Sequence, residues 1–235
     1  MEINEIKDRL AEEGYCIFEG LIDPQEAERL DGMARSIMES MGSAYISLEG
    51  SLNEIPELAP LCTHPLILEV AEAVLGEGYF LANNTALKWC KPGTPAGGLH
   101  ADWPSRGALA ADPSSLFPPW NGLQVFWMLT DSTPENGATR IVPFSHLTQR
   151  GPSRESYPQE MPVTGKKGSV FIYHNGLWHR SGANTTTDQH RMLANVYYMP
   201  AVLYRSPTTW PLIKREVYKT FSPRLQELTA RSAEI

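Results

Sequence analysis

The character of the sequence changes at Tyr79, and this change constrains the fold more than any other feature. Before Tyr79, apolar residues recur at three-and-four spacing, as in the segment that begins with Asp23, Pro24 and Glu26, a typical helix start. After Tyr79, short segments rich in aromatic and β-branched residues follow one another between prolines and glycines. Helices followed by many short strands predict a mainly β protein, a double-sheet jelly roll with the helices packed outside it.

The expected elements follow from these periodicities. We expect helices over 3–13, from Asp23 to near Gly42, over 66–75 and from Ser222 onward, and strands near 15–18, 79–91, 99–103, 123–130, 139–143, 168–173 and 190–199, with 45–48 as a further candidate. At 235 residues the chain is most simply one domain. It would comprise a mostly helical part (1–78), a jelly-roll core (79–200) and a tail (201–235) that could cover the core or mediate a homodimer.

Charge and cysteine content exclude several classes of protein. The net charge is −7, from 20 basic and 27 acidic residues, without a Lys/Arg cluster, which argues against a nucleic-acid partner. The three cysteines are widely spaced and form no C-x-x-C pair, so reduced thiols are expected. We find neither an apolar leader nor an apolar run long enough to span a membrane. These features predict a cytoplasmic protein without a membrane partner.

A His-x-Asp sequence and one distant histidine form a candidate metal site. On an extended segment alternate residues share a face, so His100 and Asp102 can reach one ion while Ala101 points away. His179 would complete a set of two imidazoles and one carboxylate, which suits non-haem Fe(II) and leaves positions open. His174 competes with His179 for this role. We favour His179, because it alone is followed by a Ser-Gly-x-Asn turn.

The residues after His179 suit a dicarboxylate ligand. Ser181 follows two residues later, Gly182 and Asn184 suggest a tight turn, and Arg191 opens an apolar run. An arginine binds a carboxylate through two parallel hydrogen bonds, and a serine hydroxyl can add a third. This pattern predicts that Arg191 and Ser181 anchor the far carboxylate of a ligand bound at the metal.

Together these blocks resemble the phytanoyl-CoA hydroxylase-type family of Fe(II)/2-oxoglutarate dioxygenases. The supporting residues are 99–102, the block 134–146, which is similar to the family's E-N-G-x-x-x-x-x-P-G-S-H stretch, and 179–191. The similarity extends loosely over residues 5 to 200. Two departures stand out: Phe144 replaces the usual glycine, and the spacing from His179 to Arg191 is one residue longer than usual.

The resemblance implies a cupin-like double-stranded β-helix core and a set of cofactors. Fe(II) would be bound by His100, Asp102 and His179, with 2-oxoglutarate and O2 as cosubstrates and succinate and CO2 as products. The expected reaction is hydroxylation of an unactivated C–H bond in a small-molecule substrate, such as one of secondary metabolism. In related halogenating enzymes a small residue replaces the carboxylate ligand, so Asp102 favours hydroxylation, desaturation or ring chemistry over halogenation.

Further contacts are expected around this centre. The resemblance implies that a polar side chain of the strand from Leu81 to Trp89 contacts 2-oxoglutarate, and the candidates are Asn83, Thr85 and Lys88. Candidates for the substrate pocket are Trp89, Trp103, Arg106 and Trp178, although each tryptophan is as easily explained as an interior aromatic. The long Pro- and Trp-containing loop 105–121 is either a cover for the substrate or a surface insertion.

Two other functions remain open at this stage. Two histidines and one aspartate also suit Zn²⁺, so a zinc-dependent hydrolase is conceivable, but it would leave Ser181 and Arg191 without a joint purpose. A jelly roll with a metal could also be a non-catalytic module that binds a metal or small molecule. An intact triad together with an intact anchor argues against that reading.

Overall fold

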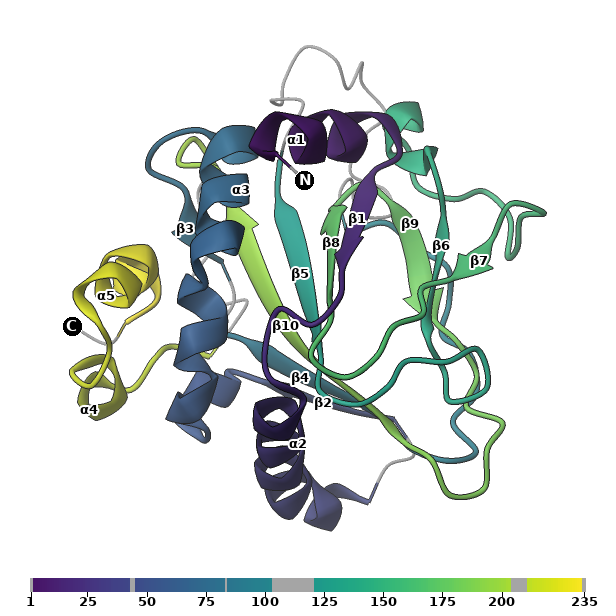
Figure 1. Cartoon of the computed structure of the whole chain (residues 1–235), viewed down its shortest axis with the longest axis horizontal. Coiled ribbons are helices and arrows are strands. Elements are labelled where there is room, and N and C mark those ends of the chain that lie inside the picture. Colours follow the sequence, from purple (N-terminus) through teal and green to yellow (C-terminus); the bar gives the residue numbers. More distant parts are fainter. Residues whose placement is uncertain (1, 43–44, 83, 103–120, 204–210, 234–235) are drawn as a thin grey trace.

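Two antiparallel sheets form the centre of the protein. The computed structural model describes residues 2–42, 45–82, 84–102, 121–203 and 211–233. The large sheet has the order β1-β8-β5-β10-β4-β2, with β3 also paired to β10, and the small sheet has the order β7-β6-β9 (Figure 1). Their bounds are β1 Tyr15–Phe18, β2 Tyr45–Glu49, β3 Phe80–Leu81, β4 Ala86–Cys90, β5 Leu123–Met128, β6 Thr139–Val142, β7 Met161–Pro162, β8 Val170–His174, β9 Trp178–Ser181 and β10 Arg191–Met199.

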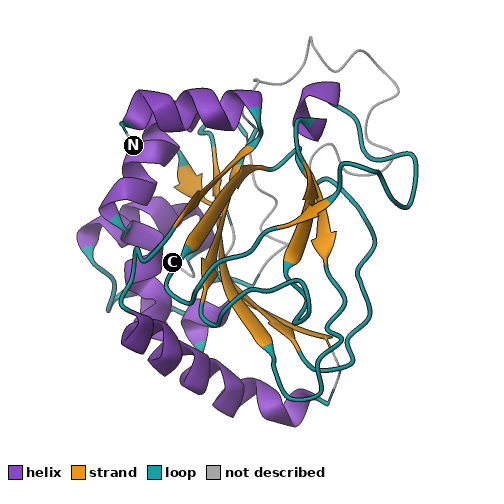
Figure 2. Cartoon of the chain, turned by 45° about the vertical axis from the view of Figure 1, so that its right-hand side comes forward, coloured by secondary structure: helices purple, strands orange, loops and turns teal. Residues whose placement is uncertain are grey.

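The helices cover one outer face of the large sheet, as Figure 2 shows. They are α1 Ile3–Glu12, α2 Pro24–Met38, α3 Pro65–Leu75, α4 Arg215–Tyr218 and α5 Pro223–Thr229, with 3₁₀ turns at Glu39–Met41, Ser51–Asn53, Pro56–Thr63, Ser145–Thr148 and Ala230–Ser232. Helix α2 begins as its sequence predicts, because the Asp23 side chain accepts a hydrogen bond from the Gln25 N–H. Leu225 and Leu228 of α5 are buried in the same core as α3, so the tail packs onto the helical layer.

Successive residues of strand β10 face opposite sides of the large sheet, and the two sides differ in environment. Its outward residues Met192, Ala194, Val196 and Tyr198 belong to the core under the helices. Its inward residues are Arg191, Leu193, Asn195 and Tyr197, of which Leu193 belongs to a smaller apolar cluster and the other three line a cavity. The smaller cluster joins the two sheets, since it includes Ile141 of β6.

The jelly-roll prediction, with helices outside the core, is confirmed, and so are most of the predicted elements. Two details differ. The predicted strand 79–91 is divided into β3 and β4, because Thr85 adopts a left-handed φ of 53° that interrupts the extended backbone. The segment 99–102 forms no strand and makes only an isolated bridge between His100 and His179. Strand β9 was not predicted.

Phe144 occupies a backbone position that explains the family's preference for glycine. Its φ is 64°, in the left-handed region that residues with a Cβ adopt only with strain. Its backbone N–H donates to the carbonyl of Glu13, which ties this turn to the end of α1.

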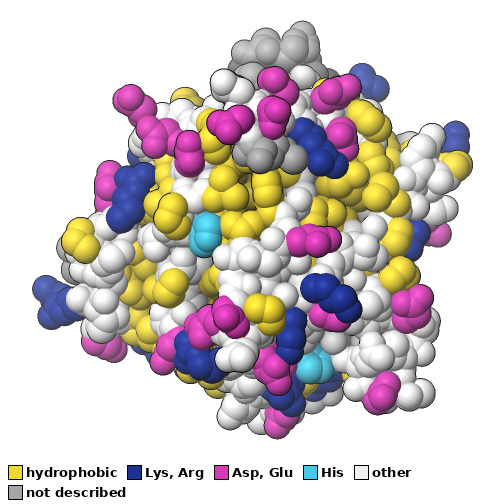
Figure 3. All heavy atoms as spheres, viewed as in Figure 1, with side chains coloured by type: hydrophobic (Ala, Val, Ile, Leu, Met, Phe, Trp, Pro, Cys, Tyr) yellow, Lys and Arg dark blue, Asp and Glu magenta, His cyan; other side chains and the backbone are white. Residues whose placement is uncertain are grey.

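The surface and the helices add two observations. On the face drawn in Figure 3, Lys and Arg side chains are interspersed with Asp and Glu. Across the described residues no single helix is long and apolar enough to cross a membrane; the bent pair Pro56–Thr63 and Pro65–Leu75 passes that test by length and composition only.

Candidate functional site

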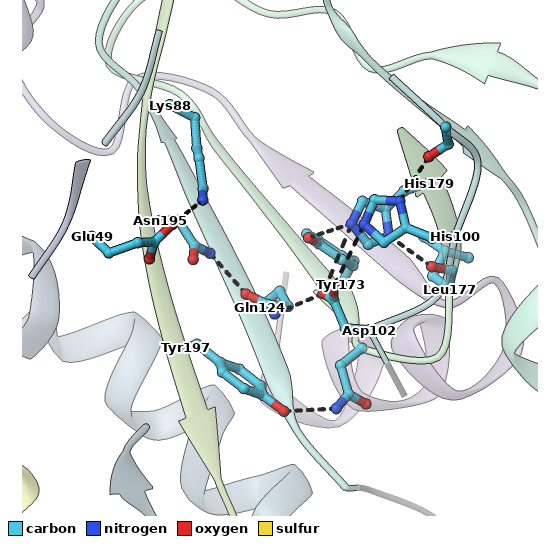
Figure 4. Close-up of polar contacts among 12 residues, drawn as sticks. Glu49, Lys88, His100, Asp102, Gln124, Tyr173, Leu177, His179, Asn195 and Tyr197 are labelled. Atoms are coloured by element: carbon cyan, nitrogen blue, oxygen red, sulfur yellow. Dashed lines mark hydrogen bonds and ion pairs between the residues drawn. The ribbon is translucent and has the colours of Figure 1, made fainter. Parts of the chain in front are cut away.

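The structure brings His100, Asp102 and His179 together between the two sheets (Figure 4). His100 and His179 exchange two backbone hydrogen bonds of 3.0 and 2.8 Å, and the Asp102 N–H donates to the Asn175 carbonyl at 3.0 Å. One potential ligand atom from each residue lies within 4.8 Å of the other two. Backbone pairing of two distant segments therefore fixes the spacing of all three side chains.

Both histidines present the same nitrogen to the centre of this cluster. Nδ1 of His100 lies 2.9 Å from the Gly98 carbonyl oxygen, and Nδ1 of His179 lies 2.9 Å from that of Leu177. A carbonyl only accepts, so Nδ1 carries the hydrogen in each ring and a neutral ring keeps its lone pair on Nε2. Burial lowers the pKa of His179, which favours this neutral form.

A chain of amides holds the carboxylate of Asp102. Gln124 donates from Nε2 to Oδ2 of Asp102 at 2.8 Å, and its own Oε1 accepts from Nδ2 of Asn195 at 2.7 Å. The bond from Asn195 fixes which end of the Gln124 amide faces Asp102. Oδ1 of Asp102 lies 3.6 Å from Nε2 of His100, and Oδ2 lies 3.8 Å from Nε2 of His179.

Arg191 is a buried cation that points into the same space. Only 1% of its surface is exposed, and it donates from Nε to the Gly137 carbonyl at 2.9 Å and from Nη2 to Oγ of Ser181 at 2.7 Å. Within the described residues no carboxylate forms an ion pair with it, although buried charges in proteins are ordinarily paired. The anchor predicted from Arg191 and Ser181 is thus assembled around a guanidinium that lacks a counter-charge.

The longer loop before Arg191 is closed at its base by Asn184. Its Nδ2 donates to the carbonyls of Gln189 at 2.8 Å and Cys90 at 3.2 Å, while its Oδ1 accepts from Thr186. The intervening residues form a closed loop at the surface. With this loop closed at the surface, Arg191 lines the cavity beside the triad.

Lys88 extends from β4 into the cavity, where its Nζ pairs with Glu49 and donates to Oγ of Ser47 at 2.6 Å. The cavity has a volume of about 300 Å³. Its lining includes the three triad residues, Lys88, Ser181, Arg191 and also Gln124, Phe126, Thr139, Tyr173, Arg180, Asn195 and Tyr197. The residues of this last group were not predicted from the sequence. Asn195 and Tyr197 could have been found, because they lie four and six residues after Arg191 on the same face of one strand.

Three predicted contacts lie away from the cavity. Trp89 belongs to the core under the helices, because it is the neighbour of inward-facing Lys88 on β4 and therefore faces outward. The ammonium of Lys91 lies 4.3 Å from the centre of the Trp89 ring. Trp178 alternates in the same way with His179 and donates to the Arg150 carbonyl at 2.6 Å. Thr85 is buried against Cys62 with 3.2 Å between Oγ1 and Sγ. The predicted residues Asn83, Trp103 and Arg106 lie outside the described residues.

The remaining histidines near the site have other partners. His174 accepts a hydrogen bond at Nδ1 from the Gly176 N–H, and its ring lies tilted against that of His146, with ring centroids 5.1 Å apart. His190 faces away from the cavity, as expected from its position beside Arg191, and its Nε2 lies 2.9 Å from Oδ1 of Asp31. Neither ring joins the triad.

Comparison with known proteins gives consistent matches over most of the chain. The family model described as "Phytanoyl-CoA dioxygenase (PhyH)" matches residues 10–192. "Dioxygenase af480" of Aspergillus fumigatus is 28% identical over 229 residues, covering 93% of this chain but 64% of the relative, slightly less than two thirds. The "Fe(II)/2-oxoglutarate-dependent dioxygenase nvfF" of Aspergillus novofumigatus is 26% identical, covering 95% of this chain and 80% of the relative.

Solved structures agree with the architecture. HygX from Streptomyces hygroscopicus, solved with nickel and 2-oxoglutarate, superposes with a TM-score of 0.70 at 17% identity, over 86% of this chain and 88% of HygX. The epimerase SnoN, in complex with Fe³⁺, α-ketoglutarate and nogalamycin RO, gives a TM-score of 0.67 at 21% identity, over 87% of this chain and 86% of SnoN. At these identities the similarity establishes the shared fold.

Proposed function

Because the chain belongs to the phytanoyl-CoA dioxygenase (PhyH) family, we propose that it is an Fe(II)- and 2-oxoglutarate-dependent oxygenase that oxidises a small molecule in secondary metabolism. The observation that carries this proposal is the position of Arg191, buried and without a carboxylate partner among the described residues, in the same cavity as the His100, Asp102 and His179 cluster. The triad offers metal ligands, and Arg191 offers a cation for a carboxylate.

The donor set fits a non-haem iron. Two imidazole nitrogens and one carboxylate oxygen, from His100, His179 and Asp102, would hold such an ion and suit Fe(II) that must also accept further ligands. Zn²⁺ would accept the same donors, as in a hydrolase, but that reaction gives no reason to bury Arg191 beside Ser181 without a counter-charge.

The protein's own groups have separate tasks in this proposal. Bound iron and 2-oxoglutarate supply the oxidising chemistry, in which decarboxylation of the keto acid to succinate and CO2 is coupled to oxidation of the substrate. Arg191 and Ser181 bind the far carboxylate of 2-oxoglutarate and fix its direction. Lys88 adds positive charge to the same cavity, and Gln124 keeps the Asp102 carboxylate aimed at the ion.

We propose hydroxylation of an unactivated C–H bond as the outcome. Asp102 supports it over halogenation, because a carboxylate hydrogen-bonded to Gln124 stands where halogenating relatives have a small residue. The names of structurally similar proteins also include an epimerase and a carbocyclase, so the product must be identified chemically.

An anaerobic titration tests the proposed function without knowledge of the substrate. Fe(II) and then 2-oxoglutarate are added to metal-free protein while the visible spectrum is recorded. We expect a weak metal-to-ligand charge-transfer band in the wild type and none in Asp102→Ala. A silent spectrum combined with tight zinc binding would favour the hydrolase, and silence with both metals would favour a binding module.

A further inference from the structure

Tyr173 places a phenol directly beside a proposed metal ligand. Its hydroxyl oxygen lies 3.3 Å from Nε2 of His179, and the two ring centroids are 4.9 Å apart (Figure 4). Since Nδ1 of His179 donates to the Leu177 carbonyl, Nε2 of the neutral ring accepts from the Tyr173 hydroxyl. A metal ion would take this same lone pair. The phenol therefore lies next to the position where oxidation is expected, and binding of metal or 2-oxoglutarate requires no such group.

The ring of Tyr173 is held rigidly in this position. The side chain is fully buried, stacks on Phe171 with centroids 4.6 Å apart and planes at 15°, and meets Phe126 edge-on at 5.3 Å. The close packing on both sides restricts rotation of the ring out of the cavity. An oxidant that meets no substrate would find this ring in the same place in every molecule.

Among the described residues that line the cavity, two carry a phenol, Tyr173 and Tyr197. A phenol is electron-rich and is oxidised far more readily than the amides of Gln124 and Asn195. Tyr197 is a second phenol in the cavity, but its hydroxyl accepts a hydrogen bond from Asn175 at 2.9 Å, and Figure 4 shows it on the far side of Gln124 from the two histidines. The two tyrosines thus differ in position and not in chemical type.

We propose that Tyr173 is a site of self-hydroxylation, oxidised to dihydroxyphenylalanine when the enzyme turns over without substrate. The inference rests on the proposed function, which supplies the oxidant. One ring C–H bond, one O2 and one 2-oxoglutarate give one C–OH, one succinate and one CO2. One oxygen atom enters the ring and the other enters succinate. O2 takes up four electrons, two from the keto acid and two from the C–H bond.

The test is turnover of the intact protein without any substrate. Wild-type protein is incubated with Fe(II), 2-oxoglutarate and isotopically labelled O2, and succinate is quantified alongside the masses of the peptides that contain Tyr173 and Tyr197. We expect succinate together with the gain of one labelled oxygen atom at Tyr173. The Tyr197 peptide, the matched internal control, should gain none.

Variants and omissions separate the possible outcomes. Asp102→Ala and omission of 2-oxoglutarate should each abolish both succinate formation and the labelled oxygen atom, here called the mark. In Tyr173→Leu, no other residue of the cavity should acquire the mark. Succinate without a mark at Tyr173, or equal marks at Tyr173 and Tyr197, would overturn the self-hydroxylation site and leave the proposed function standing. Absence of both succinate and mark in wild-type protein that shows the charge-transfer band with Fe(II) and 2-oxoglutarate would overturn the self-hydroxylation site alone, and absence of the band as well would overturn both.

Discussion

The two faces of the large sheet use the same strands for opposite purposes. Toward the helices, β10 and β5 present only apolar or aromatic side chains, including Val196, Val125 and Trp127. Toward the small sheet, the same strands present Arg191, Asn195 and Gln124, which are buried yet polar. The outer face contributes burial of apolar surface. The inner face holds charges and amides out of water, which lowers stability unless partners or ligands compensate.

The comparison teaches that stability and function can be changed separately on a single strand. Adjacent residues differ in environment completely, so a substitution on one face should leave the other property unaffected when the backbone is preserved.

The largest effect is expected on the outer face at Trp127. Its side chain is fully buried and packs against the His64 ring, with centroids 5.4 Å apart. Trp127→Ala should lower the free energy of unfolding by about 3–5 kcal/mol, because the substitution leaves a large cavity. Urea unfolding measures this loss. The Fe(II) affinity of the folded variant should match the wild type, and a more than tenfold loss would show that the two faces are coupled.

On the inner face, the largest effect is expected from substitution of Arg191. Arg191→Ala should weaken 2-oxoglutarate binding by about 2–3 kcal/mol, roughly 30- to 150-fold, through loss of a charged partner for the carboxylate. Arg191→Lys should recover only part, because an ammonium lacks the planar fork that binds a carboxylate through two parallel hydrogen bonds. Calorimetric titration with 2-oxoglutarate measures both. As a control on the opposite face, Met192→Ala should lose stability and keep its 2-oxoglutarate affinity.

Gln124→Leu should reduce metal affinity without removing a ligand. It deletes the bond that orients Asp102, and losses of about 10- to 100-fold are typical when a residue that supports a metal ligand is removed. Anaerobic Fe(II) titration gives the affinity. Val125→Ala, the neighbour that faces the helices, should lose stability and retain the wild-type affinity. An unchanged affinity in Gln124→Leu would mean that Asp102 is oriented by its backbone alone.

The smallest effect concerns pH and His146, which tethers the turn after β6 to α1. Nε2 of His146 lies 3.0 Å from the Ala11 carbonyl oxygen, and burial lowers the pKa of this ring. The unfolded chain therefore takes up a proton first, so stability is retained above about pH 6.5 and falls as the pH drops below it, by at most about 1.4 kcal/mol per pH unit for one group. His146→Gln should flatten the pH dependence of urea unfolding. His64 and His179, whose pKa values burial also lowers, would account for the remaining slope.

The convergence of the triad could be predicted from the sequence, because the convergence depends on local alternation and one long-range pairing. Two of the predicted substrate contacts do not follow the same alternation: Lys88 and Trp89 are neighbours on β4, as are Trp178 and His179 on β9, and neighbours on a strand face opposite sides of the sheet. Strand β9 itself was missed because Trp-His-Arg-Ser carries no apolar alternation, and its extended form depends on pairing with β6. Tyr173 gave no signal, since its contact with His179 exists only after the sheets assemble.

The hydrogen bonds of Asn184, which close the loop before Arg191, have a consequence for protein engineering. Because Asn184 joins the two ends of this loop through its own amide, the residues between them can change in number without pulling on the strand that follows. Lineages could therefore lengthen or shorten this turn freely, and a short tag or reporter peptide inserted between Thr187 and Asp188 should be carried outside the enzyme with its anchor undisturbed.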